Sequence, residues 1–220
     1  MISLIEPMAT KTSAPIYHLQ VVLDGLKAPV WRRLQVPGEA NLGWLHAVLQ
    51  VALGWTNSHL HQFKIGGEFY SDPRHHFAEY EGDPEILDES KFTLQKLAPR
   101  QKGSFRYEYD FGDSWEHQIT VEKVLLPDPA TATVAVCLDG ARACPPEDCG
   151  GVGGYDNLLK IIKNPKHEEH ASMMDWLGAG FDPEAYDAIE ANTYLRKLKW
   201  PRVTEDQLRK VLMARDDYRE

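Results

Sequence analysis

The sequence predicts an α+β fold, with a mainly antiparallel curved sheet, one helix packed on it and a C-terminal helical cluster. Three observations lead to this prediction. Segments in which apolar and polar residues alternate dominate the first part of the chain, a single helical pattern interrupts them at residues 41–54, and helical patterns take over after Tyr155. Strands followed by helices are typical of α+β folds and not of parallel, doubly wound sheets.

The bulk composition indicates a soluble cytoplasmic protein. A net charge of −9 over 220 residues argues against a surface that wraps nucleic acid, because such binding rests on Lys and Arg. No run approaches the roughly 18 apolar residues of a membrane span, and the opening MISLIEPMATKTSAP lacks the basic start and long apolar middle of a signal peptide. Three cysteines, an odd number, favour reduced thiols or a metal over disulfides.

The chain divides into three predicted parts. Residues 1–15 are expected to be a disordered leader, since they are mostly small and polar and end at Pro15. Residues 16–198 are expected to form a single α+β domain. Residues 199–220 are expected to be a helical extension, in which Thr204 caps an amphipathic helix.

The first elements are two strands and a helix. In residues 16–23 every second side chain is apolar, and VWRRLQV follows Pro29, so the two segments predict an antiparallel pair. Residues 41–54 carry apolar side chains at helical spacing, with Asn41 as N-cap and Gly54 as the stop.

The next segments return to alternation. The stretch HLHQFKIGGEFY predicts a strand that ends at a Gly-Gly turn and carries His59, His61, Phe63 and Ile65 on one face. Residues 71–89, rich in acidic residues, Pro and Gly, predict a long surface loop.

Residues 104–125 predict a hairpin with a three-residue turn at 112–114. The expected pairs are Phe111 with Trp115, Tyr109 with His117, Tyr107 with Ile119, and Phe105 with Val121. On the other face this register sets Asp110 opposite Glu116, a repulsion that a cation, a basic side chain or water must relieve. After the hairpin, TATVAV predicts a short strand that leads into a loop over residues 137–151, and four helical segments follow.

Several phrases carry a family resemblance: VWRRLQVP, GWTNSHLHQFKIGG, YEYDFGDSWEH, CLDGARACPPEDCGGVGGYDNLL and DWLGAGFDPEAYD. Over residues 16–198 the chain resembles the plasmid pRiA4b ORF-3-like family. The resemblance implies a compact α+β fold and no established activity. Some members of the family are carried on plasmids or beside mobile elements, which implies an accessory role in that setting.

The cysteines are the first candidate site. Cys137, Cys144 and Cys149 would need a fourth ligand to complete a tetrahedral metal site, and His117 is the choice, with His59 or His61 as alternatives. Thiolate and imidazole favour zinc. In the structural alternative the thiols only pack a loop that is shaped by its prolines and glycines.

The carboxylates are the second candidate. Asp110, Glu147 and Asp148 are the candidate catalytic residues, because clustered carboxylates bind cations or act as acid and base. In the structural alternative Asp113 makes the hairpin turn, and Glu147 or Asp148 caps the following helix.

Two functions remain open at this point. The first is a binding or accessory module for an unknown protein or nucleic-acid partner, with a cysteine loop that zinc or its own hydrogen bonds stabilise. Aromatic and basic residues such as Trp31, Arg32, Arg33, Trp44, Trp55 and Lys64 would suit a nucleic-acid surface. The alternative is a hydrolase-like, metal-dependent enzyme that uses the cysteine loop and the hairpin carboxylates. A closed four-ligand site favours the first, and three protein ligands plus water favour the second.

Overall fold

The computed structural model describes residues 14–75, 84–98, 101–127, 133–178 and 181–216, so the predicted leader lies almost wholly outside the described residues. The strands are β1 (Ile16–Leu23), β2 (Trp31–Pro37), β3 (His61–Ile65), β4 (Glu68–Ser71), β5 (Ile86–Asp88), β6 (Ser104–Tyr109), β7 (Trp115–Leu125) and β8 (Val136–Ala141). The helices are α1 (Leu42–Leu53), α2 (Leu94–Leu97), α3 (Gly151–Lys163), α4 (His170–Leu177), α5 (Ala188–Leu195) and α6 (Glu205–Asp216), with short 3-10 turns η1 (Pro73–His75) and η2 (Glu89–Lys91).

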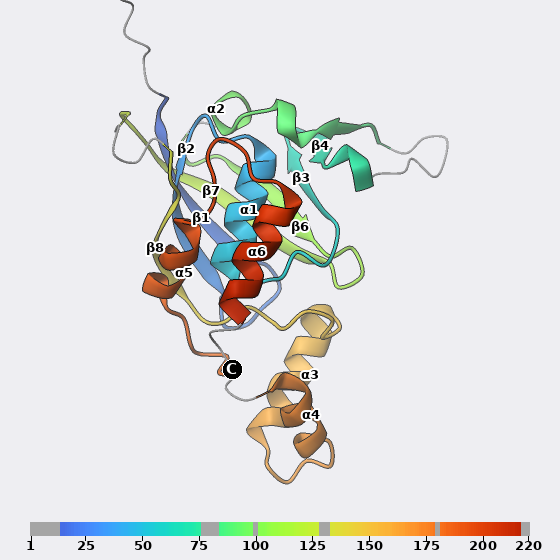
Figure 1. Cartoon of the computed structure of the whole chain (residues 1–220). Coiled ribbons are helices and arrows are strands. Elements are labelled where there is room, and N and C mark those ends of the chain that lie inside the picture. The colour runs from blue at the N-terminus through green and yellow to red at the C-terminus, as the bar shows by residue number, and fades with distance from the viewer. Residues whose placement is uncertain (1–13, 76–83, 99–100, 128–132, 179–180, 217–220) are drawn as a thin grey trace, which may run out of the picture.

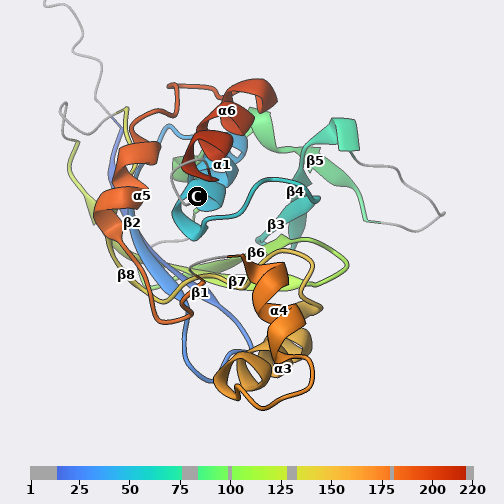
Figure 2. The same cartoon turned by 60° about the horizontal axis from the view of Figure 1, so that its bottom comes forward.

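The eight strands form one sheet in the order β5-β4-β3-β6-β7-β1-β2-β8. Neighbouring strands are antiparallel except for β4 and β5, which are parallel. The sheet curves around α1, while α3 and α4 project as a separate helical pair (Figures 1 and 2). The predicted α+β class with a curved, mainly antiparallel sheet is confirmed.

Helix α1 is the centre of the hydrophobic core. Its predicted ends are confirmed, because the Asn41 side chain accepts a hydrogen bond from the N–H of Trp44 and Gly54 takes a left-handed conformation with φ of 95°. Every residue of α1 except Gly43 is buried. The sheet covers one side of the helix, and α5 and α6 cover the other (Figure 1).

Two arginines from distant parts of the chain satisfy the last carbonyls of α1. Arg32 in β2 donates from Nε to the carbonyl of Ala52 at 2.8 Å, and Arg215 in α6 donates from Nη1 to the carbonyl of Val51 at 2.8 Å. Both arginines are buried. Guanidinium groups at a helix C-terminus also stabilise the helix through its dipole.

Helix α6 lies in the segment predicted as an extension, yet it is part of the core. Its side chains Leu208, Val211 and Leu212 are buried in the same apolar cluster as α1. The predicted helix therefore completes the core and does not project from it.

The predicted hairpin register is wrong by two residues. Tyr109 pairs with Trp115 and Tyr107 with His117, so the connection spans residues 110–114. Asp110 adopts a φ of 59° and its Oδ1 accepts from the N–H of Gly112, which begins the turn earlier than the glycine suggests. An even shift keeps the paired side chains on their predicted faces, and Asp110 and Phe111 are lost from the pairing. Phe111 is 44% exposed.

The predicted repulsion moves with the register. Glu108, not Asp110, stands opposite Glu116. Two neighbours relieve it: Arg106 donates to Glu116 at 2.8 Å, and Gln62 donates to Glu108 at 2.7 Å. A basic side chain, Arg106, therefore offsets the repulsion between the two carboxylates, as the sequence predicted.

Two other predictions need correction. The strand expected at TATVAV begins only at Val136 and continues through Cys137 to Ala141, because this stretch pairs with β2. The described part of the expected loop 71–89 contains β5 and the start of η2. Glu89, the last residue of this segment, is buried. Within the described residues no helix is both long and apolar enough to cross a membrane.

Replacing Trp115 with Ala is expected to lower the free energy of unfolding by about 3–5 kcal/mol, because the side chain is fully buried and its loss leaves a cavity. Chemical denaturation measures this effect. Trp176→Ala is the control, since that side chain is 50% exposed on α4 and a change of less than about 0.5 kcal/mol is expected. Equal midpoints for the wild type and Trp115→Ala would contradict the core position of this tryptophan.

Acid is expected to destabilise the fold through His117. Burial lowers the pKa of His117 from 6.5 to about 4, so the folded state resists a proton that the unfolded chain accepts. The stability that comes from the neutral ring is complete above about pH 6.5 and is lost as the pH falls toward 4. Urea midpoints across this range are expected to fall less steeply for His117→Gln, and parallel curves would refute the assignment.

Candidate metal centre

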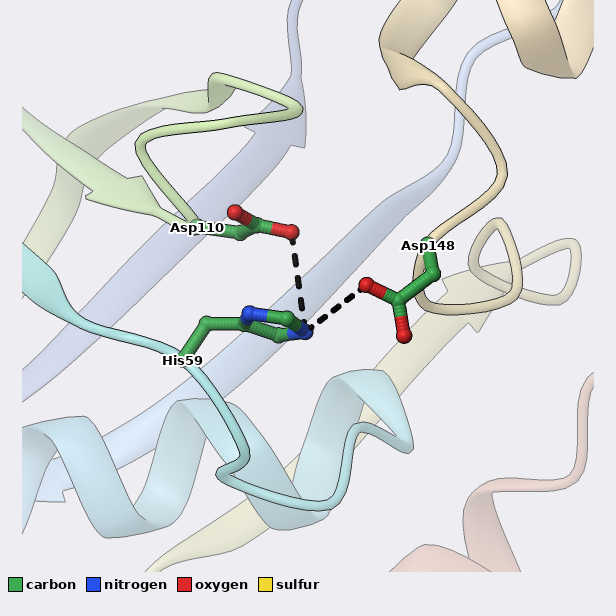
Figure 3. A group of neighbouring side chains, drawn as sticks. All are labelled: His59, Asp110 and Asp148. Carbon is green, nitrogen blue, oxygen red and sulfur yellow. Dashed lines mark ion pairs between the residues drawn. The ribbon is translucent and has the colours of Figure 1, made fainter.

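Three segments that are far apart in the sequence meet at one point beside the sheet. They are the turn before β3, the hairpin connection after β6 and the segment before α3, and they contribute His59, Asp110 and Asp148 (Figure 3). The Nε2 atom of His59 lies 3.7 Å from Oδ2 of Asp110 and 3.4 Å from Oδ1 of Asp148. The ring points its nitrogen between the two carboxylates.

The Nε2 atom of His59 is buried and forms no hydrogen bond. A buried polar atom without a partner costs about 1–3 kcal/mol. Because two carboxylates lie beside this nitrogen, a metal ion at this point would contact all three groups.

Asp110 is held in place by its own backbone. Its N–H donates to the carbonyl of Leu60 at 2.8 Å, and its Oδ1 atom accepts from the N–H groups of Gly112 and Asp113. These bonds leave Oδ2 facing His59. The same carboxyl thus shapes the hairpin turn with one oxygen and presents the other to the site.

Asp148 reaches the site because its neighbour Glu147 anchors the segment. Glu147 accepts hydrogen bonds from the hydroxyl of Tyr109 at 2.7 Å and from the N–H and hydroxyl of Thr56. Trp55 adds a bond from its indole nitrogen to the carbonyl of Pro145 at 3.1 Å. Glu147, predicted as a catalytic candidate, therefore occupies an anchoring position, and the 75% exposed carboxylate of Asp148 projects beside His59.

Glycines allow the hairpin and the start of α3 to touch. Gly151 has a φ of 65°, and a Cβ at this position would stand only 2.6 Å from the carbonyl oxygen of Asp113. The N–H of Gly150 donates to Oδ2 of Asp113 at 3.2 Å. The glycine-rich sequence here permits a close approach of backbones, which fixes Asp148 relative to Asp110.

The spacing of the three ligand atoms suits a small divalent ion. In a tetrahedral zinc site with bonds of about 2.0–2.1 Å, ligand atoms stand about 3.4 Å apart. Where the chain is described, His59, Asp110 and Asp148 are the one group of three His, Cys, Asp or Glu side chains whose ligand atoms all lie within 4.8 Å of one another. Three protein ligands leave a coordination position open.

The structure does not bring the cysteines and His117 into this group. Cys137 lies in β8 with its Sγ 2.7 Å from the hydroxyl of Tyr186, while Cys144 is buried near Arg32. His117 faces the carbonyl of Tyr107 in the sheet. Burial raises the pKa of all three thiols, that of Cys149 to about 12, and so disfavours the thiolate that binds metals. Zinc bound by the cysteines stays a prediction from the sequence.

Half of the residues expected on a nucleic-acid surface are interior. Arg32, Trp44 and Trp55 are almost fully buried, where tryptophans often contribute to packing. Arg33 pairs with Glu122 and Asp139. Trp31 is half-buried and Lys64 is exposed.

Two buried polar residues were missed by the sequence analysis. His46 stacks on His61 with ring centroids 3.4 Å apart, and Glu89 lies 2.8 Å from Nε2 of His61. A signal for His46 was present, because His46 and Gln50 stand four residues apart and interrupt an otherwise apolar helix. Nothing in the pattern around Glu89 indicated burial.

Known proteins are similar to this chain over most of its length. The family model described as plasmid pRiA4b ORF-3-like protein matches residues 15–190. The uncharacterized protein y4hQ of Sinorhizobium fredii (strain NBRC 101917 / NGR234) is 36% identical over 193 residues, which cover 86% of this chain and 96% of that protein.

A solved structure supports the same assignment. The crystal structure of the protein of unknown function MM3350 from Methanosarcina mazei Go1 is 34% identical in sequence, with a TM-score of 0.70. The similarity covers 80% of this chain and 97% of that one. Since the family model spans most of the chain, this protein belongs to the plasmid pRiA4b ORF-3-like family.

Proposed function

We propose that the protein binds a divalent metal ion through His59, Asp110 and Asp148. The observation that carries this proposal is the buried Nε2 atom of His59, which has no hydrogen-bond partner and points between two carboxylates. Imidazole favours zinc, and a set of one nitrogen and two oxygens also accepts manganese.

The anchoring of the site supports a function beyond folding. Glu147 and Asp113 use their hydrogen bonds to hold the two loops together, so the loops do not need a metal to dock. In the described part of the chain, the carboxylate of Asp148, the most exposed of the three ligands, contacts His59 and accepts no hydrogen bond that holds the loops together. A metal would then be bound by a framework that already exists.

An open coordination position favours the metal-dependent enzyme over a purely structural site. Zinc with three protein ligands lowers the pKa of a bound water to about 7 and polarises carbonyl groups, which is the chemistry of hydrolases. We therefore assign hydrolase-like activity to this site as part of the proposal. Asp110 and Asp148 act in it as ligands, not as acid and base.

Two observations bear on the biological context of the proposed function: the family description and the free cysteines. The family description names a plasmid, and an accessory role linked to plasmids or mobile elements is part of the proposal. Three free cysteines, two of them buried, suit a reducing compartment such as the cytoplasm.

Calorimetric titration of the tag-free protein with zinc and with manganese tests the metal site. The wild type is expected to bind one ion. His59→Gln and Asp148→Asn are expected to weaken binding at least about 100-fold, because each removes a direct ligand. Elemental analysis of the purified protein, before any chelator is added, checks whether the ion is present at one equivalent.

Cys149→Ser is the matched control, because Cys149 adjoins Asp148 but lies outside the ligand group. This variant is expected to bind the metal like the wild type. Loss of metal in Cys149→Ser with retention in His59→Gln would move the site to the cysteines. Absence of binding in the wild type would refute the metal site.

A further inference from the structure

Tyr109, the last residue of β6, lies where the three segments of the proposed metal site meet. It directly precedes Asp110 in the chain. Its backbone pairs with His61 of β3 on one side and with Trp115 of β7 on the other, and its side chain is fully buried. The sheet therefore fixes the point from which Asp110 enters the site.

The hydroxyl of Tyr109 joins the segments that carry the other two ligands. It accepts hydrogen bonds from the backbone N–H groups of Ser58 at 3.0 Å and of His59 at 3.3 Å. It donates to Oε1 of Glu147 at 2.7 Å, and Glu147 directly precedes Asp148. A phenol hydroxyl donates through its hydrogen and accepts through its lone pairs, so these bonds use its full capacity.

The ring of Tyr109 adds a direct contact with a ligand. It meets the imidazole of His59 edge to face, with ring centroids 5.8 Å apart, and it stacks on Trp55 with centroids 4.8 Å apart. Trp55 in turn donates to the carbonyl of Pro145, in the segment that leads to Asp148. The ring and the hydroxyl therefore act together on the position of the imidazole relative to this segment.

The hydroxyl of Tyr109 keeps its proton at neutral pH. Burial, and after it the hydrogen-bonded carboxylate of Glu147, raise the pKa of Tyr109 above its ordinary value of 10.0. A neutral hydroxyl is the species that donates to a carboxylate and accepts from N–H groups at the same time. All three hydrogen bonds therefore persist under physiological conditions.

We propose that Tyr109 is the positioning residue of the metal site, and that its side chain holds His59 and, through Glu147, Asp148 in the arrangement that binds the ion. This inference rests on the proposed function. Tyr109 supplies no ligand atom. It restricts the ligands before the ion arrives, so that less conformational freedom is lost on binding.

Tyr109→Phe tests this role, because it removes only the hydroxyl and keeps the buried ring. Calorimetric titration of the full chain with zinc is expected to show binding about 10–100-fold weaker than in the wild type, as is typical when a group that orients metal ligands is lost. Urea denaturation and circular dichroism show whether each variant is folded under the conditions of the titration.

Tyr107→Phe is the matched control. Tyr107 lies two residues earlier on the same face of β6, and its side chain is also fully buried. Its hydroxyl bonds to His46 and Gln50 of α1 and to none of the three ligands. Tyr107→Phe is therefore expected to lower stability like Tyr109→Phe but to keep the zinc affinity of the wild type.

The visible absorption of bound Co²⁺ separates positioning from stability, because the spectrum depends on the arrangement of the ligands around the ion. At saturating Co²⁺, a changed spectrum is expected for Tyr109→Phe and an unchanged one for Tyr107→Phe. Glu147→Ala breaks the same link from its other end, and it carries the test if Tyr109→Phe does not fold. In the double variant, the loss of zinc affinity is expected to be smaller than the product of the two single losses, because both changes remove one shared contact.

The outcomes distinguish this inference from the proposed function. If the wild type binds zinc and Tyr109→Phe binds it equally well, or with an unchanged Co²⁺ spectrum, the positioning role is overturned and the metal site stands. Equal weakening by Tyr109→Phe and Tyr107→Phe also overturns the positioning role, since the loss would then follow from general loosening of the sheet. If the wild type binds neither zinc nor Co²⁺, the proposed function is overturned and the positioning role with it.

Discussion

The fold depends on burying helix α1 on every side. Because nearly every residue of α1 is buried, the curved sheet alone cannot cover it, and α5 and α6 must close the opposite side. The polar side chains of α1 must then find partners inside the protein. His46 and Gln50 do so at the hydroxyl of Tyr107 in the sheet, which links the helix to β6 by hydrogen bonds as well as by packing.

This constraint also explains where the candidate metal site lies. The turn that leaves α1 carries Trp55, Thr56 and His59, and the segment before α3 docks on this turn through Glu147. The metal group forms at His59, which also lines a cavity of about 470 Å³. The phrases that carry the family resemblance, GWTNSHLHQF, YEYDFGDSWEH and CPPEDCGG, are the phrases that meet here.

Much of the fold was accessible from the sequence, because periodicity and capping are local signals. The ends of α1, the pairing of β1 with β2 and the faces of the hairpin follow from them. The hairpin register was not accessible, since Asp110 begins the turn with a side-chain bond and an unusual φ that no alternation of residues reveals. The burial of Glu89 depends on α1 and His61, which are distant in sequence.

The residues of the candidate site were named from the sequence, but not as one group. Asp110 and Asp148 were catalytic candidates and His59 an alternative fourth ligand, but the cysteines were preferred as ligands because they cluster along the chain. In space β8 directs Cys137 toward Tyr186 and Cys144 toward Arg32, so closeness in sequence does not bring the thiols to one point. His59 meets the two aspartates only because the fold brings three separate segments of the chain together.

The two arginines at the end of α1 have a consequence for the order of events during synthesis. Arg32 precedes the helix in the chain, but Arg215 lies 164 residues after Val51, and both are needed to satisfy the last carbonyls of the central helix. The helix therefore stays incompletely covered on the ribosome until the segment that forms α6 has emerged. A shortened chain that ends before α6 would expose the apolar side of α1, which makes truncated products targets for chaperones and proteases.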